Sequence, residues 1–93
     1  MQVRWLRGAL RNLDEEAGLI AADDPMAARL VVERMLAAVA VLASQPALGR
    51  PGRVAGTREL VVSQTRYLVP YRVRSGRVEL LRTFHTLRRL PGR

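Results

Sequence analysis

The chain has 93 residues, 48% of them apolar and four of them aromatic, which predicts one domain over residues 1–93 with a mainly aliphatic core. It contains no cysteine, so disulfide bridges, thiolate catalysis and cysteine-based zinc sites are excluded. The formal net charge is +8, and all 16 basic residues are arginines, which suggests an acidic or polyanionic partner.

The first half of the chain is predicted to form one strand and two helices. Residues 3–6 are apolar and aromatic, as in a short strand, and apolar residues then recur at steps of three and four up to residue 20, as in a helix. Asp24 and Pro25 should start a second helix, because aspartate caps free N–H groups and proline fits the first helical position. This helix should end near Ser44. The short connection predicts an antiparallel hairpin of helices.

The opening residues show neither a secretion signal nor a long apolar stretch. We therefore expect a cytoplasmic protein that does not have a membrane partner. Nothing in the sequence predicts a cofactor. We expect no metal site built by the protein, because such sites need several ligands and the chain has a single histidine.

The second half changes to a period of two, which predicts three strands at residues 58–63, 67–74 and 78–84. A loop rich in glycine and proline, at residues 48–53, precedes them. Pro70 cannot donate a backbone hydrogen bond, so we expect it at a sheet edge or at a bulge. Strands gathered after helices predict an α+β fold with the helices packed on one face of the sheet.

The charge is divided unevenly between the two halves. Residues 1–49 carry five arginines against six acidic residues, whereas residues 50–93 carry eleven arginines against two acidic residues, Glu59 and Glu79. Arginine in place of lysine can reflect genome composition, but the division between the halves cannot. The division therefore indicates a binding surface for an acidic or polyanionic partner on the second half.

Arginine and one histidine are the chemically notable groups of this half. Arg82 could stabilise a phosphate and His85 could donate a proton to a leaving oxygen, as metal-independent RNA cleavage requires. Two structural alternatives remain open: His85 bonds to backbone at a strand end, and Arg82 either pairs with Glu59 or faces a groove. Tyr67 and Tyr71 are either core residues or a platform for stacking bases.

Three stretches, at residues 46–62, 67–73 and 78–85, resemble the RelE/ParE toxins of bacterial type II toxin–antitoxin systems. The resemblance implies a β-α-α-β-β-β fold, with the helical hairpin packed on a small antiparallel sheet. It also implies a cognate antitoxin, whose acidic C-terminal segment wraps the toxin in a hetero-oligomeric complex.

Two branches of this family differ in their target. RelE-type toxins cleave mRNA on the ribosome with lysines, arginines and a late tyrosine, whereas this chain has no lysine and no tyrosine after Tyr71. Residues 81–85 and the Gly-Arg-Pro loop resemble the ParE branch, which poisons DNA gyrase, and we favour that branch. The RelE-type alternative would use Glu59, Arg82 and His85 as catalytic residues. A non-toxic nucleic-acid-binding module is a third alternative.

The resemblance and the charge together give two sets of candidate residues. Those expected to contact the target, gyrase or ribosome-bound mRNA, are Arg58, Arg72, Arg74, Arg82, Arg88 and Arg89. Those expected to contact the antitoxin are Arg50, Arg53, Arg66, Tyr67 and Tyr71.

Overall fold

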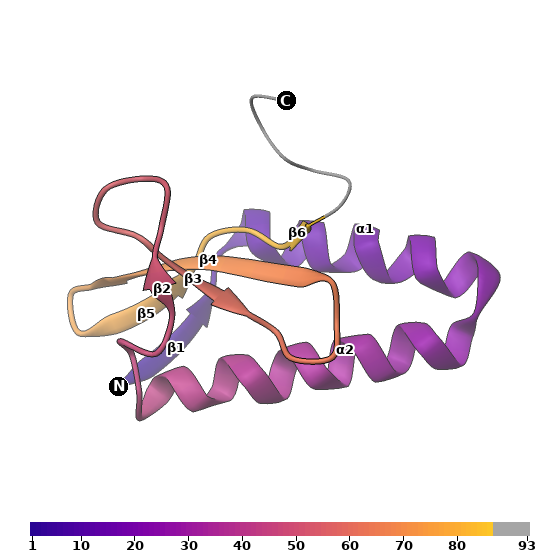
Figure 1. The fold of residues 1–93 in the computed structure, drawn as a ribbon, viewed down its shortest axis with the longest axis horizontal. Coiled ribbons are helices and arrows are strands. Elements are labelled where there is room, and N and C mark those ends of the chain that lie inside the picture. The colour runs from indigo at the N-terminus through magenta and orange to yellow at the C-terminus, as the bar shows by residue number, and fades with distance from the viewer. Residues whose placement is uncertain (87–93) are drawn as a thin grey trace.

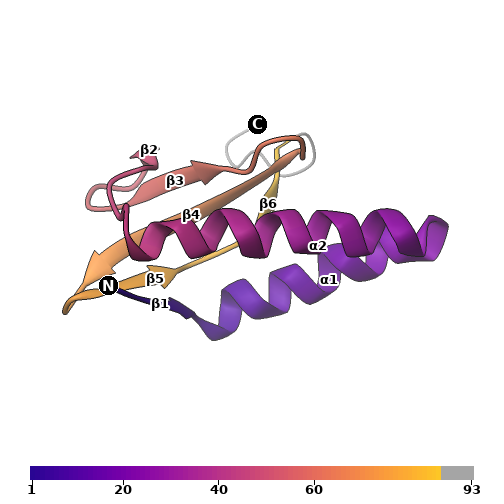
Figure 2. The ribbon, with the colours of Figure 1, turned by 90° about the horizontal axis from the view of Figure 1, so that it is seen from below.

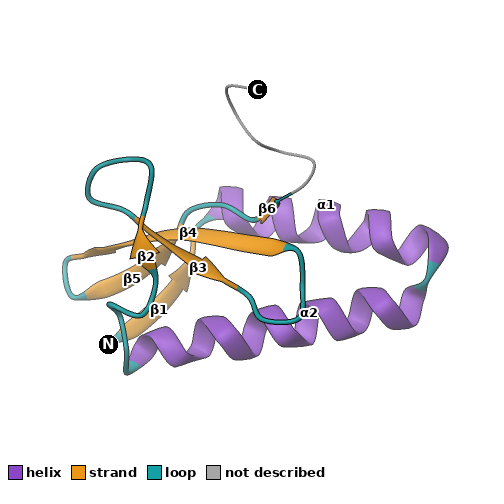
Figure 3. Ribbon diagram, in the orientation of Figure 1, coloured by secondary structure: helices purple, strands orange, loops and turns teal. Residues whose placement is uncertain are grey.

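A computed structural model describes residues 1–86, in which two helices pack on one face of a β-sheet (Figure 1). Figure 3 shows which segments of the chain form helices and which form strands. Within residues 1–86, neither helix combines the length and the apolar character needed to cross a membrane. The elements are β1 (Gln2–Trp5), α1 (Arg7–Asp23), α2 (Pro25–Ala40), the 3-10 turn η1 (Val41–Ala43), β2 (Arg50–Pro51), β3 (Arg58–Val61), β4 (Tyr67–Arg74), β5 (Arg77–Leu80) and β6 (Phe84–His85).

The helical hairpin forms as the sequence predicts. The side chain of Asp24 accepts a hydrogen bond of 3.1 Å from the backbone N–H of Ala27, and Pro25 occupies the first turn of α2. The buried residues of α1 are Ala9 and Leu13, and those of α2 include Met35 and Val39. These side chains face the sheet, while the far end of the hairpin extends beyond it (Figure 2).

The strand order in the sheet is β1-β5-β4-β3-β2, and β6 pairs with β4 beyond the end of β5. β1 runs parallel to β5, with Val3 opposite Val78, whereas every other described pair is antiparallel. The sheet is therefore mixed, which corrects the expectation of a purely antiparallel sheet. The helical hairpin carries the chain away from β1, so β1 is not joined to its neighbour by a tight turn, and no local signal fixes its direction.

Pro70 lies in the interior strand β4, which excludes the first of its two expected positions, the sheet edge. The second, a bulge, agrees with the register: Tyr71 pairs with Leu80 and Leu68 with Phe84, so residues 69–70 lie opposite residues 81–83, which are one residue more. The carbonyl of Pro70 accepts a hydrogen bond of 2.9 Å from the backbone N–H of Leu81. Since the N–H and C=O positions of one strand residue point to the same side, the missing donor of Pro70 also faces residues 81–83. At this point the neighbouring chain leaves the sheet. The missing N–H of Pro70 therefore costs the sheet no hydrogen bond between strands.

The predicted third strand, residues 78–84, is accordingly divided into β5 and β6. Between them Thr83 is buried and bonds to α1: its backbone N–H donates to Asn12 Oδ1 and its hydroxyl to the carbonyl of Ala9, both at 3.4 Å. A second correction concerns the predicted loop at residues 48–53, which contains the short strand β2. Arg50 of β2 lies opposite Glu59 of β3.

Tyr71 anchors the connection between the helices and the sheet. Its side chain is fully buried, and its hydroxyl accepts a 2.8 Å hydrogen bond from Gly49 N–H while donating a 2.7 Å bond to the carbonyl of Pro46. A Cβ atom at Gly49 would lie 2.6 Å from the Tyr71 ring, so the close approach of this backbone requires glycine. Most of the residues that fill the core around Tyr71 are aliphatic, as the composition predicts.

Candidate functional site

Helices cover only one face of the sheet (Figure 2). We call the other face the open face; its residues alternate with the core residues along each strand. A groove of about 590 Å3 runs over the open face between β2, β3, β4 and the segment that follows β5. The residues that line this groove are Arg50, Arg53, Val54, Thr57, Glu59, Leu68, Pro70, Arg72, Leu81, Arg82, Phe84 and Thr86.

The groove has an apolar floor and a basic rim. Leu68, Pro70, Leu81 and Phe84 supply the apolar surface, while the guanidinium groups of four arginines stand around it. Arg82 is exposed, and its guanidinium carbon lies 4.9 Å from the centre of the Phe84 ring, a cation–π arrangement. Arg82 thus faces the groove, which was one of the two alternatives left open by the sequence.

Glu59 organises the loop that forms one wall of the groove. Glu59 is a buried residue, 7% exposed. Its carboxylate accepts hydrogen bonds from the Arg50 side chain at 3.4 Å and from the backbone N–H of Arg53 at 3.2 Å. The Nε atom of Arg53 is also within 4.0 Å. Glu59 is therefore committed to Arg50 and Arg53 and holds both of them at the rim.

His85 lies on the opposite side of the sheet from the groove. Phe84 and His85 are consecutive strand residues and point to opposite faces. The His85 ring meets the Tyr67 ring edge-on, with 5.2 Å between ring centres, and the Tyr67 hydroxyl donates a 2.9 Å hydrogen bond to Glu16 of α1. Tyr67 and His85 border a separate hollow of about 600 Å3, which Leu19 of α1 also lines.

The three residues proposed for RNA cleavage are consequently not assembled. Glu59 and Arg82 face the groove, but His85 faces the helices. A general acid must lie within hydrogen-bonding reach of the group that it protonates, and a phosphate held by Arg82 would be on the wrong side of the sheet for His85.

The remaining arginines expected to bind the target occupy different environments. Arg72 lies on the open face and donates a 2.8 Å hydrogen bond to Glu79, which holds the pKa of the Glu79 carboxyl below its usual range. Arg58 instead donates a 2.8 Å bond to the Gly49 carbonyl. Arg74 is exposed at the end of β4. Arg88 and Arg89 lie outside the described residues.

The residues expected to contact an antitoxin are also divided. Arg50 and Arg53 line the groove, whereas Arg66 lines the hollow beside His85. Tyr67 and Tyr71 are 3% and 0% exposed, because they point towards the helices and fill the core. Little of either side chain is exposed, although Tyr67 lies at the border of the hollow that Arg66 also lines. Their contact with an antitoxin stays a prediction.

Sequence reasoning missed the apolar floor of the groove. The signal was present in β4, where Leu68 and Pro70 alternate with the buried Tyr67, Val69 and Tyr71. Apolar residues on both sides of one strand indicate that both faces of the sheet meet apolar surface. Only one of these faces is covered by the protein's own helices.

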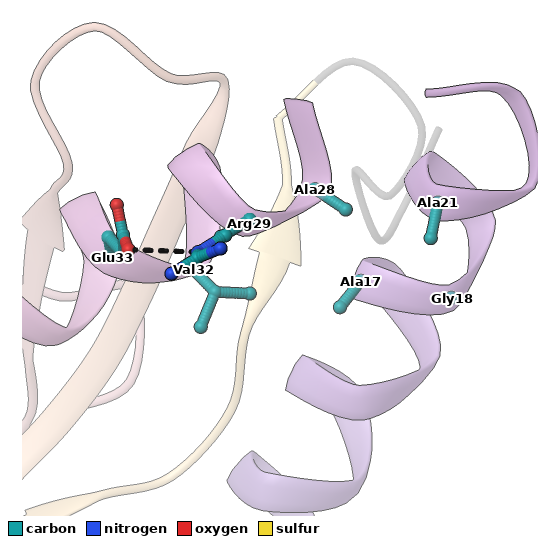
Figure 4. Close-up of a pocket in the computed structure, with 7 residues that line it drawn as sticks. All are labelled: Ala17, Gly18, Ala21, Ala28, Arg29, Val32 and Glu33. Carbon is teal, nitrogen blue, oxygen red and sulfur yellow. Dashed lines mark hydrogen bonds and ion pairs between the residues drawn. The ribbon is translucent and has the colours of Figure 1, made fainter. Parts of the chain in front are cut away.

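A further hollow, of about 390 Å3, separates α1 from α2 (Figure 4). Its walls are small apolar residues, including Ala17, Ala21 and Ala28, and an ion pair of 3.4 Å joins Arg29 to Glu33 at its border. This hollow offers no group suited to catalysis beyond that exposed pair. Among residues 1–86, no cluster of histidine, aspartate and glutamate could hold a metal ion.

A family model described as the ParE toxin of the type II toxin–antitoxin system parDE matches residues 3–90. This chain belongs to the ParE toxin family. The ParE-family chain is 48% identical over 90 residues to a Sinorhizobium fredii protein named "Putative toxin Y4kP", with 97% of this chain and 93% of the relative covered. It also matches a solved structure titled "Chromosomal ParDE TA system from P. aeruginosa", with a TM-score of 0.83 and 26% identity over 91% of this chain and 95% of the other.

These matches confirm the resemblance and the α+β fold inferred from the sequence. They extend over both helices and the sheet, so the groove on the open face belongs to the part of the chain that the ParE family model covers.

Proposed function

We propose that this ParE-family toxin inhibits DNA gyrase and is neutralised by a cognate antitoxin with an acidic C-terminal segment. The observation that carries the choice of target is the separation of Arg82 from His85 by the plane of the sheet. An endoribonuclease without a metal needs phosphate stabilisation and proton donation at one place. This chain offers them at two, which supports inhibition by binding over cleavage of RNA.

The groove supports the antitoxin part of the proposal. Its floor of Leu68, Pro70, Leu81 and Phe84 can bury apolar side chains, and its arginine rim can pair with carboxylates. A segment that combines acidic and apolar residues would match both features. Such segments are commonly disordered alone and fold on binding.

Gyrase inhibition is tested by a supercoiling assay with the purified chain and relaxed plasmid. We expect supercoiling to be inhibited at micromolar toxin, and Arg82→Gln to weaken inhibition by about tenfold, because Arg82 is an exposed charge that we expect to contact the target. Arg29→Gln, which removes an exposed arginine on α2, is the matched control and should inhibit as the natural chain does. Full gyrase activity at micromolar toxin would refute the proposed target.

The alternative target, ribosome-bound mRNA, is tested in cells and not with the purified chain. Primer extension on mRNA from cells that express the toxin should reveal no cuts positioned by codons. Cuts that disappear in His85→Gln would instead establish ribosome-dependent cleavage.

The antitoxin part of the proposal predicts that a small adjacent gene, when co-expressed, relieves growth arrest and that its product co-purifies with the toxin.

A further inference from the structure

A second basic surface lies beside the groove, at the end of the sheet where β4 turns into β5. Four arginines form it, and we call them the arginine patch: Arg4 of β1, Arg72 and Arg74 of β4, and Arg77 of β5. We propose that this patch binds the phosphate backbone of duplex DNA. The proposal deepens the proposed function, because gyrase acts on DNA and the patch would contact the DNA that the enzyme holds.

The strand register places the four arginines on one face. Arg4 lies opposite Glu79, which lies opposite Arg72, and in the next row Arg77 lies opposite Arg74. The residues between them on β5, including Val78, point into the core. All four arginines therefore project from the open face, where no helix covers them (Figure 2).

The spacing of the patch suits a row of phosphates. Neighbouring strands are about 5 Å apart and alternate residues of one strand about 7 Å apart, so β1, β5 and β4 place the arginines within an area of about 10 Å by 7 Å. One DNA strand carries a phosphate every 3.4 Å or so along the helix axis, and a span of about 10 Å therefore covers about three phosphates. Guanidinium groups bind phosphate oxygens with two parallel hydrogen bonds.

Folding alone does not account for the pairing of Arg74 with Arg77. Like charges at directly opposed positions destabilise a sheet, and among residues 1–86 neither side chain has an ion-pair partner within 4.0 Å. Glu79, which lies among these arginines, is paired with Arg72 at 2.8 Å. The patch thus keeps an excess of positive charge, which an external anion would neutralise.

The surroundings favour a nucleic acid over an acidic peptide. In β1, in β5 and in residues 72–74 of β4, the residues on the open face are all polar: Gln2, Arg4, Arg72, Arg74, Arg77 and Glu79. A peptide that folds on binding gains much of its affinity from buried apolar area, which the groove supplies and the patch does not. A phosphate backbone needs only charge and hydrogen-bond donors.

The test measures binding of the full-length chain to a fluorescent 20-base-pair DNA duplex between 50 and 200 mM salt, without gyrase. Each phosphate contact contributes about −0.9 to the slope of log affinity against log salt, so about three contacts predict a slope of about −3 or steeper. The double variant Arg74→Gln/Arg77→Gln should flatten this slope by about 2 and weaken binding by at least about tenfold at the lower salt concentration.

The matched control is Arg7→Gln/Arg11→Gln, which removes the same charge from exposed positions of α1. It should keep the slope of the natural chain. Equal weakening by the two double variants would overturn the proposal, because the effect would then come from net charge and not from the patch. Tighter binding of duplex RNA, or of a polyglutamate 20-mer, would likewise overturn the assignment to DNA.

The result is independent of the supercoiling assay. A chain that binds DNA through Arg74 and Arg77 but leaves gyrase active would support this inference and refute the proposed target. A chain that inhibits gyrase equally well with and without these two arginines, and shows no salt-dependent DNA binding, would refute this inference and leave the proposed function intact.

Discussion

The two faces of the sheet are built from the same strands but differ in what their side chains contact. On the covered face, Val69, Tyr71, Val78 and Leu80 have no exposed surface, because the helices pack over them. On the open face, the alternate residues of the same strands form an apolar groove and a patch of arginines. The difference shows that a strand can divide its residues between stability and recognition by their position alone.

The largest effect should come from shortening a buried side chain on the covered face. Leu80 is fully buried, so Leu80→Ala should lower the free energy of unfolding by about 2–5 kcal/mol. Val61→Ala removes apolar carbon from the open face, where Val61 is 53% exposed, and should change it by no more than about 0.5 kcal/mol. Urea denaturation of both variants measures the difference. Similar losses at the two positions would contradict the division between the faces.

The next effect concerns the hydrogen bonds of a core side chain. Tyr71→Phe keeps the ring but deprives Gly49 N–H and the Pro46 carbonyl of their partner, so we expect a loss of about 1–3 kcal/mol. The amide of Gly49 should then exchange with solvent faster than in the natural chain. Unchanged exchange at Gly49, measured by NMR, would show that another acceptor replaces the hydroxyl.

On the open face we expect a substitution to stabilise the fold. Arg74→Gln removes one of two like charges at opposed positions and should raise the free energy of unfolding by about 0.2–1 kcal/mol at low salt. High salt should remove this gain because it screens the repulsion. Arg7→Gln, on α1, is the control and should show no such dependence on salt. A destabilised Arg74→Gln variant would mean that Arg74 supports the fold.

Most of the fold could be predicted from the spacing of the apolar residues along the chain. Asp24 with Pro25 marked the start of α2, and the alternation in residues 67–74 marked β4, because both signals act between residues close in the chain. The parallel pairing of β1 with β5 could not be inferred in this way. It joins residues far apart in sequence, and an edge strand leaves no local sign of the partner it chooses.

The candidate site was harder to infer for the same reason. In an unbroken strand Arg82 would lie on the core face with Val78 and Leu80, and His85, three residues later, would lie on the opposite face. Residues 81–83 leave the sheet so that Thr83 can bond to α1, and this excursion decides which side chains share a face. A break caused by a distant helix is a tertiary effect. Neither strand propensity nor spacing can predict it.

The smallest effect should come from the ion pair between Arg72 and Glu79 on the open face. The hydrogen bond from Arg72, helped by the charges of Arg72, Arg74 and Arg77, lowers the pKa of Glu79 from its ordinary value of 4.5. A carboxyl group with a lowered pKa in the folded state stabilises the fold above its ordinary pKa, and this contribution disappears as the pH falls through the lowered pKa. Glu79→Gln should therefore be less stable than the natural chain at pH 7 and equally stable near pH 2, as judged by denaturation midpoints.

Glu33→Gln, which breaks an exposed pair on α2, should show a weaker dependence on pH. A stability difference for Glu79→Gln that stayed the same at both pH values would place its cause in packing and not in charge.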